Sequence, residues 1–262
     1  MEVRINGVLI HYVEHGSGVP LLALHGAGVD HREIEAALEA IIPKEGYRRI
    51  YPDLPAMGRS SANGLTSNED VVRLLGDLID ELGIDELLLV GHSYGAYLAR
   101  GLATQRPDSV LGLAVICPLR DGTGATPEQR AVVEEASAYD ELETDQCEGF
   151  NQYFVVRTPE NARRYRDFVV PGNALVDEDA LGCIFANWSV DVESAQYSGP
   201  TLIVVGRLDS TVGYAGGVEL LDAYPHASLA VVEDAGHALM HERPALVASL
   251  VNDWLERSKQ AQ

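Results

Sequence analysis

Residues 87–105 read LLLVGHSYGAYLARGLATQ, and this stretch decides the fold. Its four opening apolar residues predict a strand buried on both faces, which is typical of a parallel sheet covered by helices. The residues after position 95 predict a helix that ends before Pro107. Gly91 and Gly95 flank Ser93, as expected where a sharp strand-to-helix turn leaves no room for a Cβ atom. The stretch therefore predicts a serine that projects from a tight turn at the end of a central strand.

Strands and helices alternate on both sides of this stretch. A hairpin is expected around Asn6-Gly7, and helices are expected over 30–42 and from Ser67 to Leu82, where apolar residues recur at helical spacing. A further buried strand is predicted at Leu21–Leu24, and further strands are predicted at Leu111–Ile116, Thr201–Val205 and Ser228–Val232. This order predicts an α/β fold, with a mostly parallel central sheet covered by helices on both faces.

Residues 118–197 break the alternation, because they hold no convincing buried strand. We therefore expect a helical cap over 118–197, inserted into a core made of 1–117 and 198–262. All four phenylalanines of the chain lie in this cap. Its aromatic side chains can form the core of the cap or line an apolar pocket. The candidate pocket residues are Phe154, Cys183 and Trp188.

A serine nucleophile needs a histidine base and a carboxylate that orients the base. Both are expected on loops that follow later strands, in the order serine, acid, histidine. Asp209 follows the strand at 201–205, and His237 follows the strand at 228–232. We therefore predict catalysis by Ser93, Asp209 and His237. The alternative bases are His226 and His241, and the alternative acid is Asp121.

An oxyanion hole needs two N–H donors near the serine. One is expected from Tyr94, because the first residues of a helix have unpaired N–H groups. The second is expected from the N–H of Ala27, in the HGAG loop that follows the strand at 21–24. Small residues let the backbone approach a ligand, so Gly26 and Gly28 are expected to shape this loop and to lie at the substrate.

The residues after this loop have two interpretations. Asp30 and Glu33 fit a helix N-cap and its partner three residues later, and that pattern explains both acids. His31 lies between them and could meet a polar group of the substrate.

The chain carries 40 Asp and Glu residues against 19 Lys and Arg, a formal net charge of -21 at pH 7. Such a charge repels nucleic acids and anionic lipid surfaces. No apolar run is long enough for a membrane helix, and the first residues lack the pattern of a secretory signal. We therefore expect a cytoplasmic protein that acts on a small molecule, without a nucleic-acid or membrane partner. The oligomeric state stays open between monomer and homodimer.

The three cysteines are an odd number and lie far apart in the chain. A chain of 262 residues can bury its own core, so a disulfide framework is not expected. Cys117, Cys147 and Cys183 are expected as reduced thiols, with Cys183 an ordinary buried one unless it lines the pocket. No metal-ligand spacing links them, and neither a metal nor a cofactor is predicted.

Five segments together resemble the α/β-hydrolase superfamily, specifically its capped branch of esterases, carbon–carbon bond hydrolases, proline iminopeptidases and epoxide hydrolases. The segments are LLALHGAG, YPDLPAMGRS, LLLVGHSYGAYLARGLA, TLIVVGRLD and EDAGHALMHERP, in the usual order and spacing. The resemblance covers essentially the whole chain. It implies the α/β-hydrolase fold, and it implies Ser93 as nucleophile, Asp209 as acid and His237 as base. It also implies the amides of Ala27 and Tyr94 as the oxyanion hole.

The sequence departs from this family pattern at two positions. Ala56 stands where the loop DLPGxGxS usually has its first glycine. Ala238 stands where ring-cleavage hydrolases often have tryptophan. Epoxide hydrolases and haloalkane dehalogenases carry an aspartate nucleophile, so Ser93 argues against both activities.

The sequence therefore predicts a cofactor-free serine hydrolase that cleaves a small to medium, partly apolar carboxylic ester through an acyl-enzyme. Hydrolysis of carbon–carbon bonds, lactones or amides uses the same parts, and these reactions are the alternatives. Alternatives from other classes are a ligand-binding, receptor-like protein and a lyase on the same fold.

Overall fold

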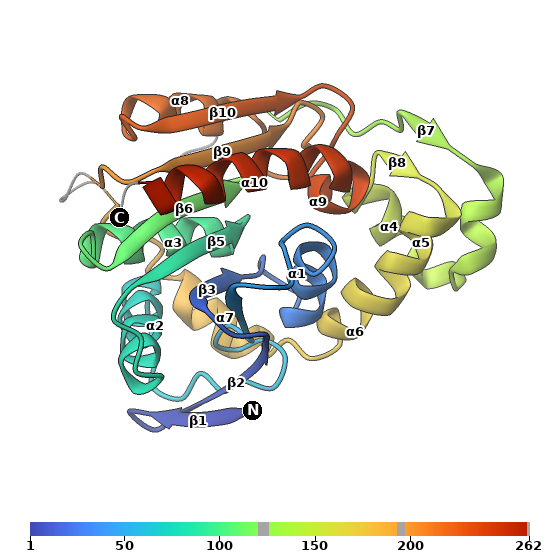
Figure 1. The fold of residues 1–262 in the computed structure, drawn as a ribbon. Coiled ribbons are helices and arrows are strands. Elements are labelled where there is room, and N and C mark those ends of the chain that lie inside the picture. Colours follow the sequence, from blue (N-terminus) through green and yellow to red (C-terminus); the bar gives the residue numbers. More distant parts are fainter. Residues whose placement is uncertain (120–125, 193–196, 261–262) are drawn as a thin grey trace.

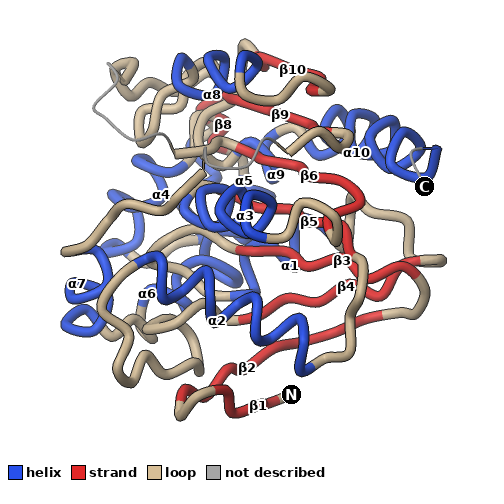
Figure 2. Tube along the Cα trace, turned by 90° about the vertical axis from the view of Figure 1, so that its left-hand side faces the viewer, coloured by secondary structure: helices blue, strands red, loops and turns tan. Residues whose placement is uncertain are grey.

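The computed structural model describes residues 1–119, 126–192 and 197–260. Its main feature is an eight-stranded sheet in the order β1-β2-β4-β3-β5-β6-β9-β10, whose strands lie one above the other in Figure 2. The strands are β1 (Glu2–Ile5), β2 (Val8–His15), β3 (Val19–Leu24), β4 (Tyr47–Pro52), β5 (Leu87–His92), β6 (Val110–Ile116), β9 (Thr201–Gly206) and β10 (Ala227–Val232). The predicted α/β fold is confirmed.

The sheet is parallel except at its N-terminal edge. There β1 pairs antiparallel with β2, and β2 pairs antiparallel with β4, whereas the other neighbours are parallel. Asn6 and Gly7 join β1 to β2 with φ angles of 52° and 86°, as a two-residue type I′ turn requires. The expected hairpin is therefore present.

Helices cover both faces of the sheet, because successive residues of a strand point to opposite sides. In β5, Leu87 and Leu89 belong to one apolar cluster, with residues of α2 and α3. Leu88 and Val90 belong to a second cluster, with residues of α1, α9 and α10. The helices are α1 (His31–Leu38), α2 (Asn68–Glu81), α3 (Tyr94–Gln105), α8 (Ala215–Glu219), α9 (Leu239–Glu242) and α10 (Pro244–Gln260), with a 3-10 turn at Leu220–Asp222. Burial on both faces explains why the strand sequence is apolar without interruption.

The chain between β6 and β9 forms short elements, several of which gather beyond α9 at one end of the molecule (Figure 1). They are β7 (Val133–Glu134), β8 (Val156–Arg157), α4 (Cys147–Tyr153), α5 (Pro159–Arg164), α6 (Val170–Asn173) and α7 (Glu178–Phe185), with 3-10 turns at Ala136–Glu141 and Thr144–Gln146 and a π-helical turn at Tyr165–Val169. Phe150, Phe154 and Tyr165 belong to a third apolar cluster here. The cap boundaries stay predictions, and the alternative acid Asp121 lies outside the described residues.

The helix expected over 30–42 is shorter than predicted. Asp30 caps α1 by accepting the N–H of Arg32, but the helix ends at Leu38 and continues as turns. None of the described helices is long and apolar enough to cross a membrane.

Candidate active site

Ser93 follows β5 directly and forms the turn into α3. Its backbone has φ 54° and ψ -118°, a conformation that residues other than glycine rarely adopt. A Cβ atom on Gly91 would lie 2.5 Å from the Cα atom of Ala96, and one on Gly95 would lie 2.1 Å from the carbonyl oxygen of Leu24. Glycine at both positions is therefore what allows α3 to pack so closely on β3 and β5.

Three side chains from three loops form one hydrogen-bonded chain. The Oγ atom of Ser93 lies 3.0 Å from Nε2 of His237, and Nδ1 of His237 lies 2.8 Å from Oδ2 of Asp209. All three residues are buried. The second oxygen of Asp209 accepts the backbone N–H groups of Thr211 and Val212, which fixes the carboxylate. The structure thus brings together the three residues that the sequence nominates.

The surroundings of Asp209 and His237 set the protonation state of each side chain. Burial alone would raise the pKa of Asp209, but His237 and the hydrogen bonds to the carboxylate hold it below its ordinary value. Burial alone would lower the pKa of His237, but the carboxylate of Asp209 raises it above its ordinary value. An ionised Asp209 accepts the proton of Nδ1, so the lone pair of Nε2 faces the hydroxyl of Ser93. This arrangement can take a proton from the serine.

The loop after β3 lies directly against Ser93. A Cβ atom on Gly26 would lie 3.4 Å from the Cβ atom of Ser93. His25 is fully buried and fixes the loop, because its Nδ1 donates to the carbonyl of Gly26 at 2.7 Å while its Nε2 accepts the N–H of Leu54 at 2.9 Å. The first histidine of HGAG is therefore a structural residue of the loop.

The two amides nominated for the oxyanion hole lie on elements that flank the serine. Ala27 is exposed on the loop, and Gly28 beside it has φ 77°. Tyr94 is the first residue of α3, so its N–H has no acceptor within the helix. Its hydroxyl donates to Asn68 at 2.7 Å, which holds the side chain away from solvent. The oxyanion role of both amides stays a prediction.

His31 belongs to a different cluster. Its Nδ1 donates to Asp53 at 2.6 Å, and Nδ1 of His11 donates to the other oxygen of Asp53 at 2.9 Å. The carboxylate also accepts the N–H of Arg59, and its pKa lies well below the ordinary range despite burial. The described contacts do not join His31 to the chain that starts at Ser93.

The other nominated side chains lie in three different settings. Phe154 is 0% exposed and packs against Phe150, with ring centroids 5.1 Å apart. Trp188 stacks on Tyr97, with centroids 5.5 Å apart and planes 7° apart. Cys183 is exposed on α7, so the expectation of a buried thiol is wrong there. Substrate contact by these residues stays a prediction.

Glu33 is the residue whose role the sequence pattern missed. Asp30 alone caps α1, whereas the carboxylate of Glu33 is fully buried and accepts from the hydroxyl of Tyr153 at 2.9 Å and from Nε2 of His241 at 3.2 Å. Tyr153 in turn lies edge-on to the ring of His237, with centroids 5.8 Å apart. No local signal marks these contacts, because the two partners lie 120 and 208 residues away in sequence.

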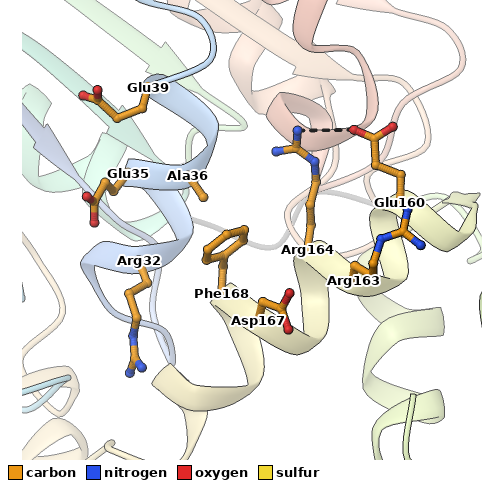
Figure 3. Close-up of a pocket in the computed structure, with 9 residues that line it drawn as sticks. All are labelled: Arg32, Glu35, Ala36, Glu39, Glu160, Arg163, Arg164, Asp167 and Phe168. Carbon is orange, nitrogen blue, oxygen red and sulfur yellow. Dashed lines mark hydrogen bonds and ion pairs between the residues drawn. The ribbon is translucent and has the colours of Figure 1, made fainter. Parts of the chain in front are cut away.

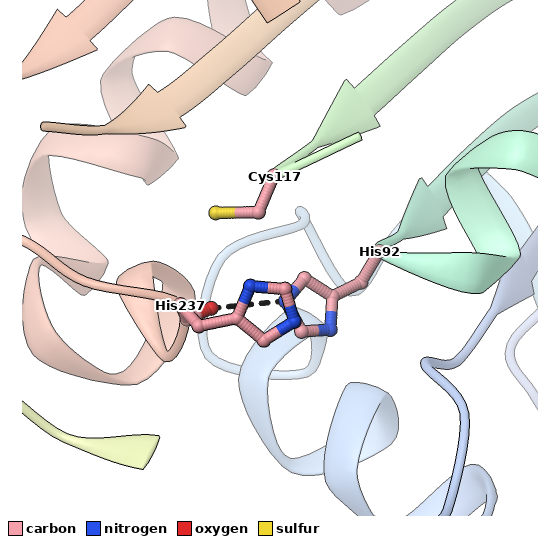
Figure 4. A group of neighbouring side chains, drawn as sticks. All are labelled: His92, Cys117 and His237. Carbon is pink, nitrogen blue, oxygen red and sulfur yellow. Dashed lines mark hydrogen bonds between the residues drawn. The ribbon is translucent and has the colours of Figure 1, made fainter. Parts of the chain in front are cut away.

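Cys117 follows β6 and lies at the same edge of the sheet (Figure 4). One atom each of Cys117, His92 and His237 lie within 4.8 Å of one another. Both ring nitrogens of His237 already take part in hydrogen bonds, and Nε2 of His92 donates to the main-chain oxygen of His237 at 3.0 Å. The contacts of this group therefore support the loop that carries His237.

A hollow of about 560 Å³ opens between α1 and the helical segment 159–169 (Figure 3). It is lined by Arg32, Glu35, Ala36, Glu39, Glu160, Arg163, Arg164, Asp167 and Phe168. Its cations have carboxylate partners, among them Asp30 for Arg32 and Glu160 for Arg164. None of the lining residues takes part in the hydrogen bonds that join Ser93, His237 and Asp209, so this hollow is separate from the candidate active site.

Similarity to known proteins identifies the family of this protein. Residues 21–250 match the model of the alpha/beta hydrolase family. The (E)-2-((N-methylformamido)methylene)succinate hydrolase of Acinetobacter baylyi is 25% identical over 260 residues, which cover 96% of this chain and 95% of the relative. A 2-hydroxy-6-oxononadienedioate/2-hydroxy-6-oxononatrienedioate hydrolase of Klebsiella pneumoniae is 26% identical, covering 95% and 91%. A solved alpha/beta superfamily hydrolase from Oenococcus oeni is 25% identical, with a TM-score of 0.88 over 99% of both chains. The chain therefore belongs to the alpha/beta hydrolase family and is a hydrolase.

Proposed function

We propose that the protein is a serine hydrolase that cleaves a small to medium, partly apolar carboxylic ester through an acyl-enzyme. One observation carries the proposal, namely the hydrogen-bonded chain from the hydroxyl of Ser93 through His237 to the buried Asp209. A hydroxyl is a weak nucleophile unless a base within hydrogen-bond reach removes its proton as the new bond forms. His237 meets that condition, and Asp209 orients it.

The proposed reaction has two steps. In acylation, Oγ of Ser93 attacks the carbonyl carbon while Nε2 of His237 takes the hydroxyl proton, and the N–H groups of Ala27 and Tyr94 hold the oxyanion. The carbon–oxygen bond to the alcohol then breaks, and His237 gives the proton to that alcohol. In deacylation, water attacks the acyl carbon, His237 takes a proton from the water and returns it to Ser93, and the acid leaves. Asp209 stabilises the imidazolium in both steps.

The segment predicted as a cap, 118–197, is proposed to enclose the apolar part of the ester. Phe185 and Trp188 of this segment pack on the ring of Tyr94, with centroids 5.1 and 6.0 Å apart. Tyr94 follows Ser93 directly, so these two aromatic side chains pack beside the turn that carries the serine. Apolar surroundings with a few polar groups favour a substrate that has a hydrocarbon part.

Hydrolysis of a dicarboxylate is the second candidate, because the two relatives described above are named for the hydrolysis of a succinate derivative and of dioates. Ala238 weighs against the ring-cleavage type of carbon–carbon hydrolysis. It is 1% exposed and lies in the third apolar cluster with Phe150 and Phe154, where a tryptophan would overpack the site.

A fluorophosphonate probe followed by mass spectrometry tests the nucleophile. We expect one adduct on Ser93 in the parent protein and no adduct at position 93 in Ser93→Ala. Turnover of a short-chain aryl ester should fall by at least about 10³-fold in Ser93→Ala and in His237→Ala. A folded parent that takes no label, or variants that keep the parent rate, would refute the proposal. A panel of esters, lactones, amides and unsaturated dicarboxylates then separates the two candidates.

A further inference from the structure

A second carboxylate is buried beside the proposed catalytic chain. Glu33, on α1, is 0% exposed, and its Oε1 atom accepts hydrogen bonds from the hydroxyl of Tyr153 at 2.9 Å and from Nε2 of His241 at 3.2 Å. Burial alone would raise the pKa of Glu33, but nearby His92 and these two donors lower it to about 2. Glu33 therefore carries a negative charge inside the protein.

His92 connects this carboxylate to the proposed base. Its Nε2 atom donates to the main-chain oxygen of His237 at 3.0 Å, and its Nδ1 atom lies 3.7 Å from Oε1 of Glu33. The rings of His92 and His237 are in contact, with centroids 4.8 Å apart (Figure 4). Tyr153 also contacts the ring of His237, with centroids 5.8 Å apart. Glu33 therefore reaches His237 through two of its own neighbours.

The charge on Glu33 is not needed for packing. An ionised carboxylate is costly to bury, and an apolar side chain could fill the same space more cheaply. The cost is not fully offset here, because Oε2 of Glu33 and Nδ1 of His92 have no hydrogen-bond partner among the described residues. A buried charge is explained if it acts on a neighbouring group that gains and loses a proton during the reaction. The imidazole of His237 is such a group.

We propose that Glu33 is a positioning residue for His237. Through Tyr153 it helps to hold the histidine in place, and its charge stabilises the imidazolium that forms during the reaction. This inference rests on the proposed function. Asp209 orients the ring through Nδ1, whereas His92 fixes the main chain of the same residue. Because Tyr153 belongs to α4, its hydroxyl also ties the placement of α4 to the site.

Several groups face the imidazole and contribute to its titration. They are Ser93, Asp209, Glu33, Glu242, His92, Cys117 and Tyr153. Glu242 is the third acid among them. Its oxygens accept three backbone N–H groups, which offset part of its charge, and burial raises its pKa. Glu33 is therefore the second source of negative charge at the imidazole, after Asp209.

Glu33→Gln removes the charge and keeps the size of the side chain. Loss of a nearby anion lowers the pKa of His237, so the acid limb of the kcat/KM profile should move down by about one pH unit. The plateau value of kcat should fall about tenfold with KM nearly unchanged, because the imidazolium loses stabilisation. Glu35→Gln is the matched control on the same helix, at a residue that pairs with His15, and it should change neither quantity.

Histidine titration by ¹⁵N NMR measures the pKa of His237 without relying on turnover. We expect a value about one unit lower in Glu33→Gln than in the parent and in Glu35→Gln. Tyr153→Phe removes a donor but keeps the charge, so it should not lower this pKa. A folded Glu33→Gln protein in which His237 titrates as in the parent overturns the inference, whatever its activity. A parent that titrates as expected but takes no label on Ser93 refutes the proposed function alone.

Discussion

Ser93 has a strained backbone, with φ 54° and ψ -118°. Strain of this kind amounts to about 1–3 kcal/mol, and glycine would relieve it. Glycine also adds about 0.5–1 kcal/mol of unfolded-state entropy that folding must overcome. We therefore expect Ser93→Gly to be more stable than Ser93→Ala by about 1 kcal/mol, although both lack the nucleophile. Urea denaturation measures the difference, and a glycine variant no more stable than the alanine variant would contradict this expectation.

His237 and Asp209 determine the expected pH dependence. Although burial alone would lower the pKa of His237, Asp209 raises it above 6.5, and only the neutral imidazole can accept a proton from Ser93. Activity should therefore be lost as the pH falls through this raised pKa, and the acid limb of kcat/KM should lie above pH 6.5. A pH–rate profile with its acid limb below 6.5 would contradict the assignment.

The same two groups make the stability of the fold depend on pH in opposite directions. The raised pKa of His237 contributes stability that is fully present below pH 6.5 and is lost as the pH rises through the raised value. The lowered pKa of Asp209 contributes stability that is present above pH 3.8 and is lost as the pH falls through the lowered value. Between pH 3.8 and pH 6.5 both groups are charged in the folded protein, and the ion pair contributes fully to the stability of the fold.

Asp209→Asn tests the orienting carboxylate. The amide cannot stabilise the imidazolium, and it also favours the wrong tautomer of His237, so kcat should fall by about 10³–10⁴-fold. Asp234→Asn is the matched control, because it makes the same change three residues before His237 at an acid that pairs with Arg243. Aryl ester turnover provides the measurement. An Asp209→Asn enzyme within about tenfold of the parent would rule out the acid role.

Single residues can be placed from the sequence where the order of the strands determines their position. Asp209 and His237 each follow a parallel strand, and the carboxyl ends of such strands meet at one edge of the sheet. Glu33 was not predictable in this way. An acid three residues after Asp30 is fully explained by helix capping, and only the fold shows that it faces His241 and Tyr153 instead.

At the level of elements, the contact between α3 and β3 depends on one missing methyl group. Gly95→Ala would place a Cβ atom 2.1 Å from the carbonyl oxygen of Leu24, and backbone cannot yield as a flexible side chain would. We expect a loss of about 3 kcal/mol or more in the free energy of unfolding, or failure to fold.

Gly182→Ala is the matched control for this contact. Gly182 also lies within a helix, α7, but a Cβ atom there would meet nothing within 4 Å. Alanine should therefore stabilise the protein by about 0.5–1 kcal/mol, through its higher helix propensity. Urea denaturation of both variants measures the two effects. Destabilisation by both substitutions to a similar extent would show that helix packing at Gly95 is not the cause.

The elements that the sequence predicts best are those with two covered faces. The strands at 21–24, 87–90 and 201–205 are found to within two residues as β3, β5 and β9, because burial on both sides demands continuous apolar residues. The π-helical turn at Tyr165–Val169 and the two-residue strands β7 and β8 carry no such signal. Their conformations depend on packing between segments that lie far apart in sequence.

Across the whole molecule, negative charge dominates the surface. The formal net charge is -21. The buried acids among the described residues are Asp30, Glu33, Asp53, Asp209 and Glu242. Most other described carboxylates therefore reach water, where their mutual repulsion opposes the compact state. The repulsion can be predicted from the composition alone, whereas only the folded structure shows which acids are buried.

Salt should therefore stabilise this protein at neutral pH. Screening shortens the reach of a charge from about 30 Å at 0.01 M salt to about 3 Å at 1 M. We expect the free energy of unfolding at pH 7, measured in urea, to rise by on the order of 1 kcal/mol over this range. Salt also weakens surface ion pairs such as Arg106–Asp80, but each exposed pair contributes only about 0–1 kcal/mol, so the net repulsion should prevail. The control is the same salt step near pH 4.6, the isoelectric point of the sequence, where the net repulsion vanishes and the gain should disappear. An equal gain at both pH values would instead point to a general effect of salt on apolar burial.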